Sequence, residues 1–205
     1  MAKERLKVGI IAAEHSSDRL GAKIIKSLQD IFEIDLYGLG GPEVNANPIV
    51  TPNGIDYHDL HVMGLIDPLI KLPKILLNRR KLLKLFISNN IDIFIGVDLP
   101  DFNIFFHKKL KSNNVKTIQI VSPSVWGWRE NRIRSIEANI DLTMCLFKFE
   151  CDFYSKKNMQ SFFFVHPFSQ LKPNNIEDIF KRHSLVASKN FISILPGSRE
   201  SEISE

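Results

Sequence analysis

Short apolar runs alternate with segments of helical periodicity along most of the chain, and this alternation limits its fold more than any other feature. Residues 7–13 and 92–97 are such runs, rich in Ile and Val, as is typical of strands buried on both faces. Residues 18–31 follow the first run and repeat apolar side chains with a period near 3.6. Repeated strand–helix units predict an α/β fold, in which a parallel sheet carries helices on both faces.

The same patterns predict the remaining elements. We expect strands at 33–39, 116–121, 142–147, 162–165 and 191–195, and helices at 103–112, 130–138, 149–156 and 176–183. Segment 63–86 is helical in pattern but contains Pro68 and Pro73, which predicts two helical pieces. A polar linker near 168–175 divides the chain into a domain at 1–170 and a segment at 171–205 that holds the linker and a first strand and turn.

Composition excludes several classes of protein. Of 205 residues, 44% are hydrophobic and 24% charged, which are values of globular domains and not of disordered or collagen-like chains. The net charge of +4 would suit a nucleic-acid-binding protein, but the basic residues are scattered along the chain. A protein of that class would bind DNA or RNA with an affinity that falls steeply as the salt concentration rises. Cys145 and Cys151 lack metal-site spacing, which indicates free thiols in a reducing compartment. No apolar run approaches the ~18 residues of a membrane-spanning helix.

Ligands of open parallel sheets bind beyond the carboxyl ends of the strands. The first strand runs into Glu14, Ser16, Ser17 and Asp18 at the start of a helix. Ser17 or Asp18 is either an N-cap or part of an anion site on free backbone amides, and the sequence leaves both open. Glu14 stands at the end of a buried strand, where a carboxylate costs desolvation unless it is used or paired.

The run after residues 92–97 offers a second acidic site. Pro100 disfavours helix at the preceding residue, so Asp98 should stay at the strand end, where it is our candidate for a general base. Asp101 is either the N-cap of the next helix or a ligand-binding residue, and Asn103 follows it.

Two further runs carry candidate binding residues. Trp126 stands between Pro and Gly in a run that reaches Arg129, and we interpret this run as a wall for a sugar or acyl group, with Arg129 and Arg132 facing phosphate. The Pro-Gly-Ser-Arg turn that ends at Arg199 suits a diphosphate. His58 and His61 have no third ligand nearby, so we expect no metal site.

Seven motifs, in this order, resemble those of the lipid-A-disaccharide synthase family. They are Ala13-Glu-His-Ser-Ser-Asp18, Gly40-Gly-Pro42, Val62-Met-Gly64, Gly96-Val-Asp-Leu-Pro-Asp-Phe-Asn103, Val121-Ser-Pro-Ser-Val-Trp-Gly-Trp-Arg129, Phe149-Glu150 and Leu195-Pro-Gly-Ser-Arg199. The first loop departs from the family pattern, because Ala13 and Ser17 replace two glycines. The motifs span the whole chain, but the family chain is about twice as long.

The resemblance implies an inverting glycosyltransferase of the GT-B type, built of two Rossmann-like domains, with no metal or other cofactor. It implies transfer of 2,3-diacylglucosamine from its UDP form to 2,3-diacylglucosamine 1-phosphate (lipid X), with release of UDP. Residues 1–170 would be the acceptor-side domain and 171–205 the start of a truncated donor-binding domain. The alternative is a non-catalytic remnant that retains only acceptor or membrane binding.

Site residues and partners follow from the same resemblance. It implies Asp98 and Glu14 as catalytic residues, and donor-diphosphate binding by Gly197, Ser198 and Arg199. It implies substrate binding by Ser16, Asp18, Asp101, Asn103, Ser122, Trp126 and Arg129. It implies a cytoplasmic protein, peripheral on the inner face of the cytoplasmic membrane, with no nucleic-acid partner, and association into homo-oligomers stays open. Segment 65–86 is either a basic apolar surface on anionic lipid or an ordinary core helix with a solvated basic face.

Overall fold

The computed structural model describes residues 3–60, 67–125 and 132–165, together with 169, 172, 175–184, 192, 194 and 195. The chain divides into two compact units, Met1–Pro167 and Phe168–Glu205, and each is considered by itself.

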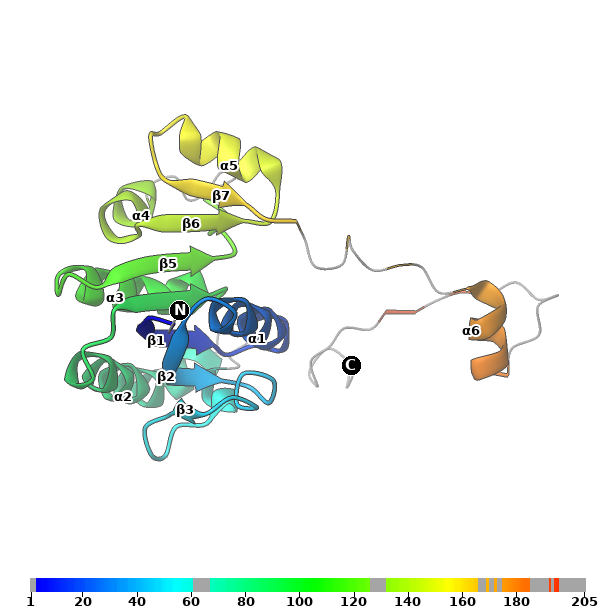
Figure 1. Ribbon diagram of the computed structural model, residues 1–205, viewed down its shortest axis with the longest axis horizontal. Helices are drawn as coiled ribbons and strands as arrows, with labels where there is room; N and C mark the ends of the chain where they lie inside the picture. The colour runs from blue at the N-terminus through cyan, green and yellow to red at the C-terminus, as the bar shows by residue number, and fades with distance from the viewer. Residues whose placement is uncertain are drawn as a thin grey trace. The chain divides into compact units, whose positions relative to one another are not determined.

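The first unit is built on one seven-stranded sheet (Figure 1). Its strands are β1 (Arg5–Ala12), β2 (Glu33–Gly40), β3 (Ile49–Val50), β4 (Ile93–Val97), β5 (Lys116–Ile120), β6 (Leu142–Cys145) and β7 (Ser161–Phe163). They lie in the order β3-β2-β1-β4-β5-β6-β7, and every neighbouring pair is parallel. The chain therefore starts in the middle of the sheet and builds outward on each side in turn.

Helices connect the strands. They are α1 (His15–Gln29), the 3₁₀ turn η1 (Tyr57–Leu60), α2 (Asp67–Ser88), α3 (Pro100–Lys111), α4 (Ile133–Asn139) and α5 (Lys148–Ser155). The predicted fold class, an α/β Rossmann-like parallel sheet with helices on its faces, is confirmed.

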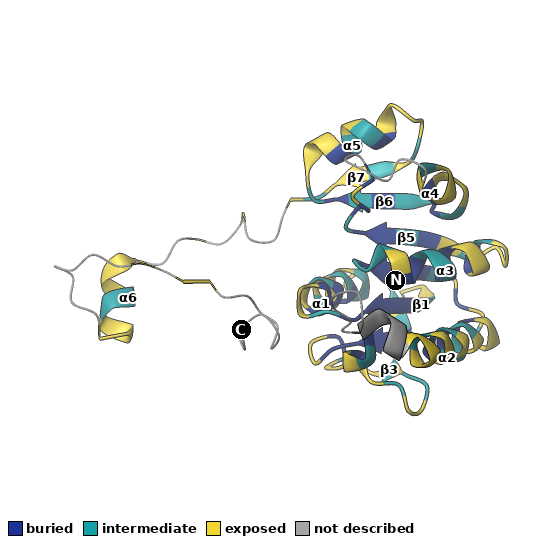
Figure 2. Cartoon of the chain, turned by 180° about the vertical axis from the view of Figure 1, so that it is seen from behind, coloured by how far each residue is buried: buried dark blue, intermediate teal, exposed yellow. Residues whose placement is uncertain are grey.

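Two apolar cores lie on opposite faces of the sheet, because successive strand side chains point to opposite sides. Val8 and Ile10 of β1 pack with Ile25 of α1 in one core. Ile11 packs in the other core, which holds Phe86 of α2 together with side chains of α3. In Figure 2 the inner strands such as β1 and β5 are mostly dark blue, while the helices show yellow on their outward sides, as expected for a sheet whose centre is covered on both faces.

Helix α2 runs without a break from Asp67 to Ser88, so the prediction of two helical pieces is wrong. Pro68 lies in the first turn, where an amide has no partner within the helix. Pro73 lies inside the helix and removes one backbone hydrogen bond. Buried contacts of Leu82 and Phe86 with the sheet outweigh that loss. Residues 63–66 of the predicted segment lie outside the described residues.

The second unit contains helix α6 (Ile176–Arg182), close to the predicted 176–183. The side chain of Asn175 caps it by accepting a hydrogen bond from the amide of Glu177 at 3.1 Å. The prediction of a strand at 191–195 is not borne out at Ile192, Ile194 and Leu195, which are described outside any strand and are at least 83% exposed. A strand needs a hydrogen-bonding neighbour, and no other strand is assigned among the described residues of this unit.

Candidate active site

The acids predicted as catalytic residues follow the ends of two neighbouring strands. β1 and β4 lie side by side, and the order of the strands reverses at this point, which is where open α/β sheets bind ligands. Ile11 of β1 pairs with Gly96 of β4, so the two strands end level. Glu14 and Asp98, both half-buried, therefore stand at the same edge of the sheet.

Glu14 is the N-cap of α1, which therefore begins three residues earlier than predicted. The hydroxyl of Ser17 accepts a hydrogen bond from the amide of Glu14 at 2.7 Å and donates one to its carbonyl at 2.8 Å. Ser17 thus supports the cap from within the first turn. Neither Ala13 nor Ser17 has a positive φ, so the loss of two glycines from this loop carries no backbone strain. Ser16 is exposed beside Glu14.

Asp18 holds the turn that follows β2. Its two carboxylate oxygens each accept a backbone hydrogen bond at 2.9 Å, one from Glu43 and one from Val44, and the residue is only 3% exposed. A Cβ on Gly41 would stand 2.6 Å from Asp18 Oδ2, so glycine makes room for the carboxylate. This placement corrects two predictions: Asp18 is not the N-cap, and its oxygens are turned to the chain's own backbone instead of a substrate.

Tyr57 reaches the same loop from η1. Its hydroxyl lies 3.0 Å from Nδ1 of His15. Burial raises the pKa of Tyr57, and the nearby Asp18 and Glu14 raise it further. The phenol therefore stays protonated at neutral pH in the surroundings of Glu14 and Asp18.

The turn after β4 has an unusual backbone. Asp98 and Leu99 take left-handed conformations, with φ of 55° and 43°. Leu99 is the N-cap of α3 and Pro100 is its first residue, so Asp98 stands at the strand end as predicted. Leu99 avoids the right-handed helical region before Pro100, but by taking the left-handed conformation and not the extended one. Asp101 lies in the first turn, so the prediction that it is the N-cap is wrong.

Asp101 forms an ion pair with Arg132, which precedes α4. Arg132 was expected to face phosphate, and the structure pairs it with this carboxylate instead. Both side chains are largely exposed, so the pair contributes little to stability.

A buried polar network lies beneath the turn. Asn103 Nδ2 donates to the carbonyl of Asp98 at 2.7 Å, and Gln119 Nε2 donates to the same carbonyl at 2.9 Å. His107 Nε2 lies 2.9 Å from Gln119 Oε1. All three side chains are fully buried. Asn103, predicted to bind substrate, therefore supports the backbone of Asp98 from below.

The end of β5 is constrained in a similar way. Val121, directly after the strand, has a φ of 67°. Ser122 is 5% exposed, and the hydroxyl of Tyr154 donates to the carbonyl of Pro123 at 3.2 Å. Burial raises the pKa of Tyr154, so this donor keeps its proton.

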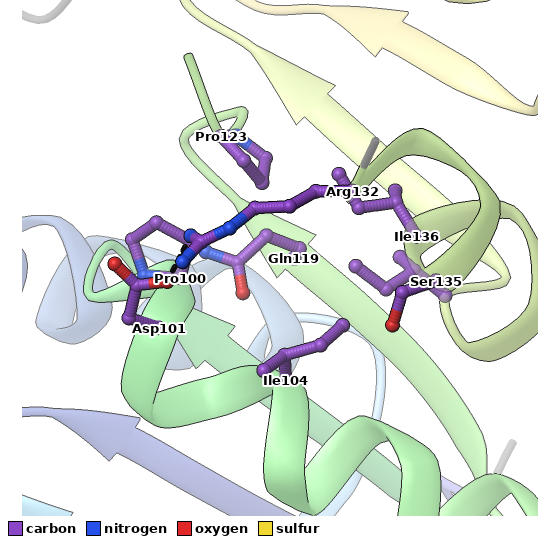
Figure 3. A pocket seen from close by; sticks show the side chains of 9 residues that line it. Pro100, Asp101, Ile104, Gln119, Pro123, Arg132, Ser135 and Ile136 are labelled. Atoms are coloured by element: carbon purple, nitrogen blue, oxygen red, sulfur yellow. Dashed lines mark hydrogen bonds and ion pairs between the residues drawn. The ribbon is translucent and has the colours of Figure 1, made fainter. Parts of the chain in front are cut away.

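A cavity of about 250 Å³ opens between α3 and α4. Figure 3 shows Arg132 reaching across it to Asp101, with Gln119 between the two helices. It is lined by Pro100, Asp101, Ile104, Gln119, Pro123, Arg132, Ser135, Ile136 and Ile140. Its mainly apolar wall with an ion pair at one side suits an apolar group carried by a polar ligand.

Several predicted site residues lie outside the described part of the chain. They are Trp126, Arg129, Gly197, Ser198 and Arg199. His61 does as well, and the described residues contain no group of three or more His, Cys, Asp or Glu placed to hold a metal ion. No described helix combines the length and apolarity that crossing a bilayer requires.

His107 and Gln119 were missed by sequence reasoning. The signal was present: Gln119 interrupts the apolar strand pattern, and His107 stands in a helix segment rich in Phe. A polar side chain inside a buried strand needs a hydrogen-bond partner, which is a reason to search for one nearby.

Comparison with known proteins agrees with the family resemblance and the fold. The sequence profile of the family described as lipid-A-disaccharide synthetase matches residues 8–205. The chain is 40% identical over 204 residues to the lipid-A-disaccharide synthase of Pseudoalteromonas translucida, covering 98% of this chain and 52% of the relative. It is 35% identical over 208 residues to that of Acinetobacter baylyi, covering 99% and 52%.

A third relative, lipid-A-disaccharide synthase 2 of Legionella pneumophila, is 37% identical over 207 residues, covering 99% of this chain and 53% of the relative. The chain thus spans about half the length of the curated relatives it matches. Because the family's profile matches residues 8–205 and the named relatives are 35–40% identical along nearly the whole chain, the chain belongs to the lipid-A-disaccharide synthase family, a family of glycosyltransferases.

Proposed function

We propose that this chain supplies the acceptor-side half of a lipid-A-disaccharide synthase, which transfers 2,3-diacylglucosamine from UDP to lipid X and releases UDP. The observation that carries the proposal is the position of Asp98 and Glu14 at the ends of neighbouring strands, at the reversal of the sheet. The chain aligns with about half the length of each named relative, and this supports assigning it one half of such an enzyme.

The proposed chemistry follows from the position of Asp98. Its carboxylate takes the proton of the acceptor 6-hydroxyl, and the oxygen attacks the anomeric carbon of the donor sugar. The bond from that carbon to the diphosphate breaks with inversion, and UDP leaves with the electron pair. Glu14 and Ser16 would face the acceptor, and Asp101 would contribute through the ion pair that it forms with Arg132. The hydroxyl of Ser122 is buried, so this residue would support the turn after β5 instead of touching the acceptor. Trp126 and Arg129 would complete the cleft, and Gly197, Ser198 and Arg199 would hold the donor diphosphate.

Direct assay of the chain tests the proposal. The purified chain is incubated with UDP-2,3-diacylglucosamine and lipid X, and disaccharide 1-phosphate is measured by mass spectrometry. Product formation would exclude a non-catalytic remnant. Absence of product together with retained lipid X binding would identify an acceptor-binding half. Absence of both would refute the proposal.

The role of Asp98 is tested in a full-length relative, at the aspartate that aligns with it. We expect the Asn variant to lose about 100-fold or more in turnover, since a general base contributes 10²–10⁴-fold. The matched control is the equivalent of Asp92→Asn, because Asp92 lies before the other end of the same strand and its carboxylate accepts a hydrogen bond from the amide of Lys7 at 2.8 Å. Near-normal turnover of the Asp98 variant would eliminate the base assignment.

We also propose peripheral binding at the inner face of the cytoplasmic membrane, through α2. Leu82 and Phe86 bury one side of the helix in the core, while Leu72, Leu76 and Leu77 on other sides are 44–51% exposed. The exposed basic residues Arg80 and Lys84 continue from these leucines along the helix. Exposed leucines beside cations suit the surface of an anionic bilayer.

Vesicle flotation tests this surface. We expect the chain to float with phosphatidylglycerol vesicles. A double variant, Leu76→Ser with Leu77→Ser, should lose at least about tenfold in vesicle affinity. Ile31→Ser is the matched control, because Ile31 is 63% exposed and follows α1, which packs in the other core of the sheet from α2. Equal binding by the double variant and the control would refute the assignment to α2.

A further inference from the structure

The buried network beneath the ends of β4 and β5 has one consistent direction of hydrogen bonding. Gln119 Nε2 donates to the carbonyls of Asp98, Ile120 and Val121 at 2.9, 3.1 and 3.2 Å. The other end of this amide, Oε1, is therefore an acceptor, and it lies 2.9 Å from His107 Nε2. The proton of the His107 ring must stand on Nε2. Its Nδ1 is buried without a hydrogen-bond partner, as expected for an unprotonated nitrogen.

The neutral ring fits its surroundings. Burial lowers the pKa of His107 to about 4, against smaller opposing effects of Gln119 and the charge of Asp141. The ring of Phe94 packs edge to face on it, with centroids 5.0 Å apart. His107 therefore acts at neutral pH as a fixed donor that orients the Gln119 amide.

The network forms its hydrogen bonds with the strained backbone at the ends of β4 and β5. Asp98, Leu99 and Val121 have φ values of 55°, 43° and 67°. Such conformations are uncommon for residues with a Cβ and rare for β-branched Val. They persist where the surroundings over-determine them, and here the Asp98 carbonyl receives two amide donors and the Val121 carbonyl one.

Gly96 shows that the sheet makes room for these amides. A Cβ at this position would stand 2.8 Å from Asn103 Nδ2 and 2.9 Å from Gln119 Oε1. Two side chains from different elements thus pass over one strand residue without a side chain. The packing of β4 is shaped around the network.

We propose that His107, Gln119 and Asn103 are positioning residues, which hold the ends of β4 and β5 in their left-handed conformations and so fix the place of the Asp98 carboxylate. The catalytic consequence rests on the proposed function of Asp98. The left-handed conformations of the two strand ends, and their dependence on the three side chains, do not require that Asp98 is a base.

The test uses NMR of the isotope-labelled 205-residue chain. Cα shifts and HN–Hα couplings report φ at Asp98, Leu99 and Val121, and long-range nitrogen correlations report the tautomer of His107. Asn90 and Asn114 serve as internal references, because they have φ values of 48° and 61° at sites without a bond to this network.

We expect the Nε2–H tautomer in the wild type. His107→Leu should shift the signals of Asp98, Leu99 and Val121 and leave both asparagines unchanged. His107→Gln should restore the wild-type values, because its amide nitrogen reaches as far as the imidazole Nε2. The opposite tautomer, unchanged φ in His107→Leu, or equal shifts in both variants would overturn the proposal.

A second variant keeps the test decisive if His107→Leu does not fold. Asn103→Ala removes one of two donors to Asp98 and leaves Gln119 in place, so it should shift Asp98 and Leu99 but not Val121. No shift at Asp98 would overturn the proposal. The role of Asp98 as base is tested separately, by turnover of the variant that lacks its carboxylate. Turnover that survives in that variant would refute the role as base and would leave the NMR result on the network intact.

Discussion

Acid should destabilise the chain through His107 before it acts on the carboxylates. In the unfolded chain the imidazole takes a proton near pH 6.5, whereas in the folded protein burial lowers its pKa to about 4. Between these values the unfolded state binds more protons, so the free energy of unfolding falls as the pH falls. The difference corresponds to about 3 kcal/mol once the pH is below both pKa values.

The effect of His107 on the free energy of unfolding is largest between pH 6.5 and about 4, where the carboxyl groups with shifted pKa values remain charged. The pKa values of the carboxyl groups of Asp59 and Asp141 are lowered by hydrogen bonds to Lys74 and Lys111, against the opposing effect of burial. Their stabilisation is present above the unfolded pKa near 3.8 and is lost as the pH falls below it. From pH 7 to 4.5, His107 alone should remove about 2 kcal/mol.

The assay is urea unfolding followed by circular dichroism at pH 7, 6, 5 and 4.5, with His107→Gln as the comparison. The variant keeps a donor for Gln119 and has no titratable side chain at position 107, while every other titratable group of the chain is unchanged. The free energy of unfolding of the wild type should fall relative to the variant, by up to about 1.4 kcal/mol per pH unit. Parallel pH profiles for the two proteins would refute a neutral, buried His107.

Two further predictions concern stability at neutral pH, measured by urea unfolding. Gly96→Ala should cost about 1–3 kcal/mol, because its Cβ would meet two fixed amide side chains. The control Gly9→Ala should cost less, because its closest contact is the movable end of an isoleucine side chain. Asp18→Asn should cost about 2 kcal/mol, because the amide keeps an acceptor for only one of the two backbone N–H groups and turns its own NH2 toward the other. Glu43→Gln, in an exposed ion pair, should stay within about 0.5 kcal/mol. Equal losses within either pair would contradict these assignments.

Most elements of the first unit were predictable because their patterns are local. Strands such as β1 and β4 are continuous apolar runs, and the helices between them repeat with their own period. Pro100 also predicted that β4 ends before Asp98, whereas α3 begins at Pro100, three residues before its predicted start. The continuity of α2 was not predictable, because burial of Leu82 and Phe86 against distant strands offsets the local effect of Pro73.

The residues of the candidate site show the same difference between local patterns and contacts between distant segments. Local sequence patterns were enough to predict that Glu14 and Asp98 follow strand ends, since that depends on a few neighbouring residues. It could not determine that β1 and β4 are adjacent, nor that the oxygens of Asp18 bind the turn after β2 and those of Asp101 pair with Arg132. The link from His107 through Gln119 to Asp98 joins a helix, a strand and a turn, and only the tertiary structure brings them within hydrogen-bonding distance. The physical reason is that apolar periodicity is a property of a segment, whereas the partner of a buried polar group is chosen by packing between segments.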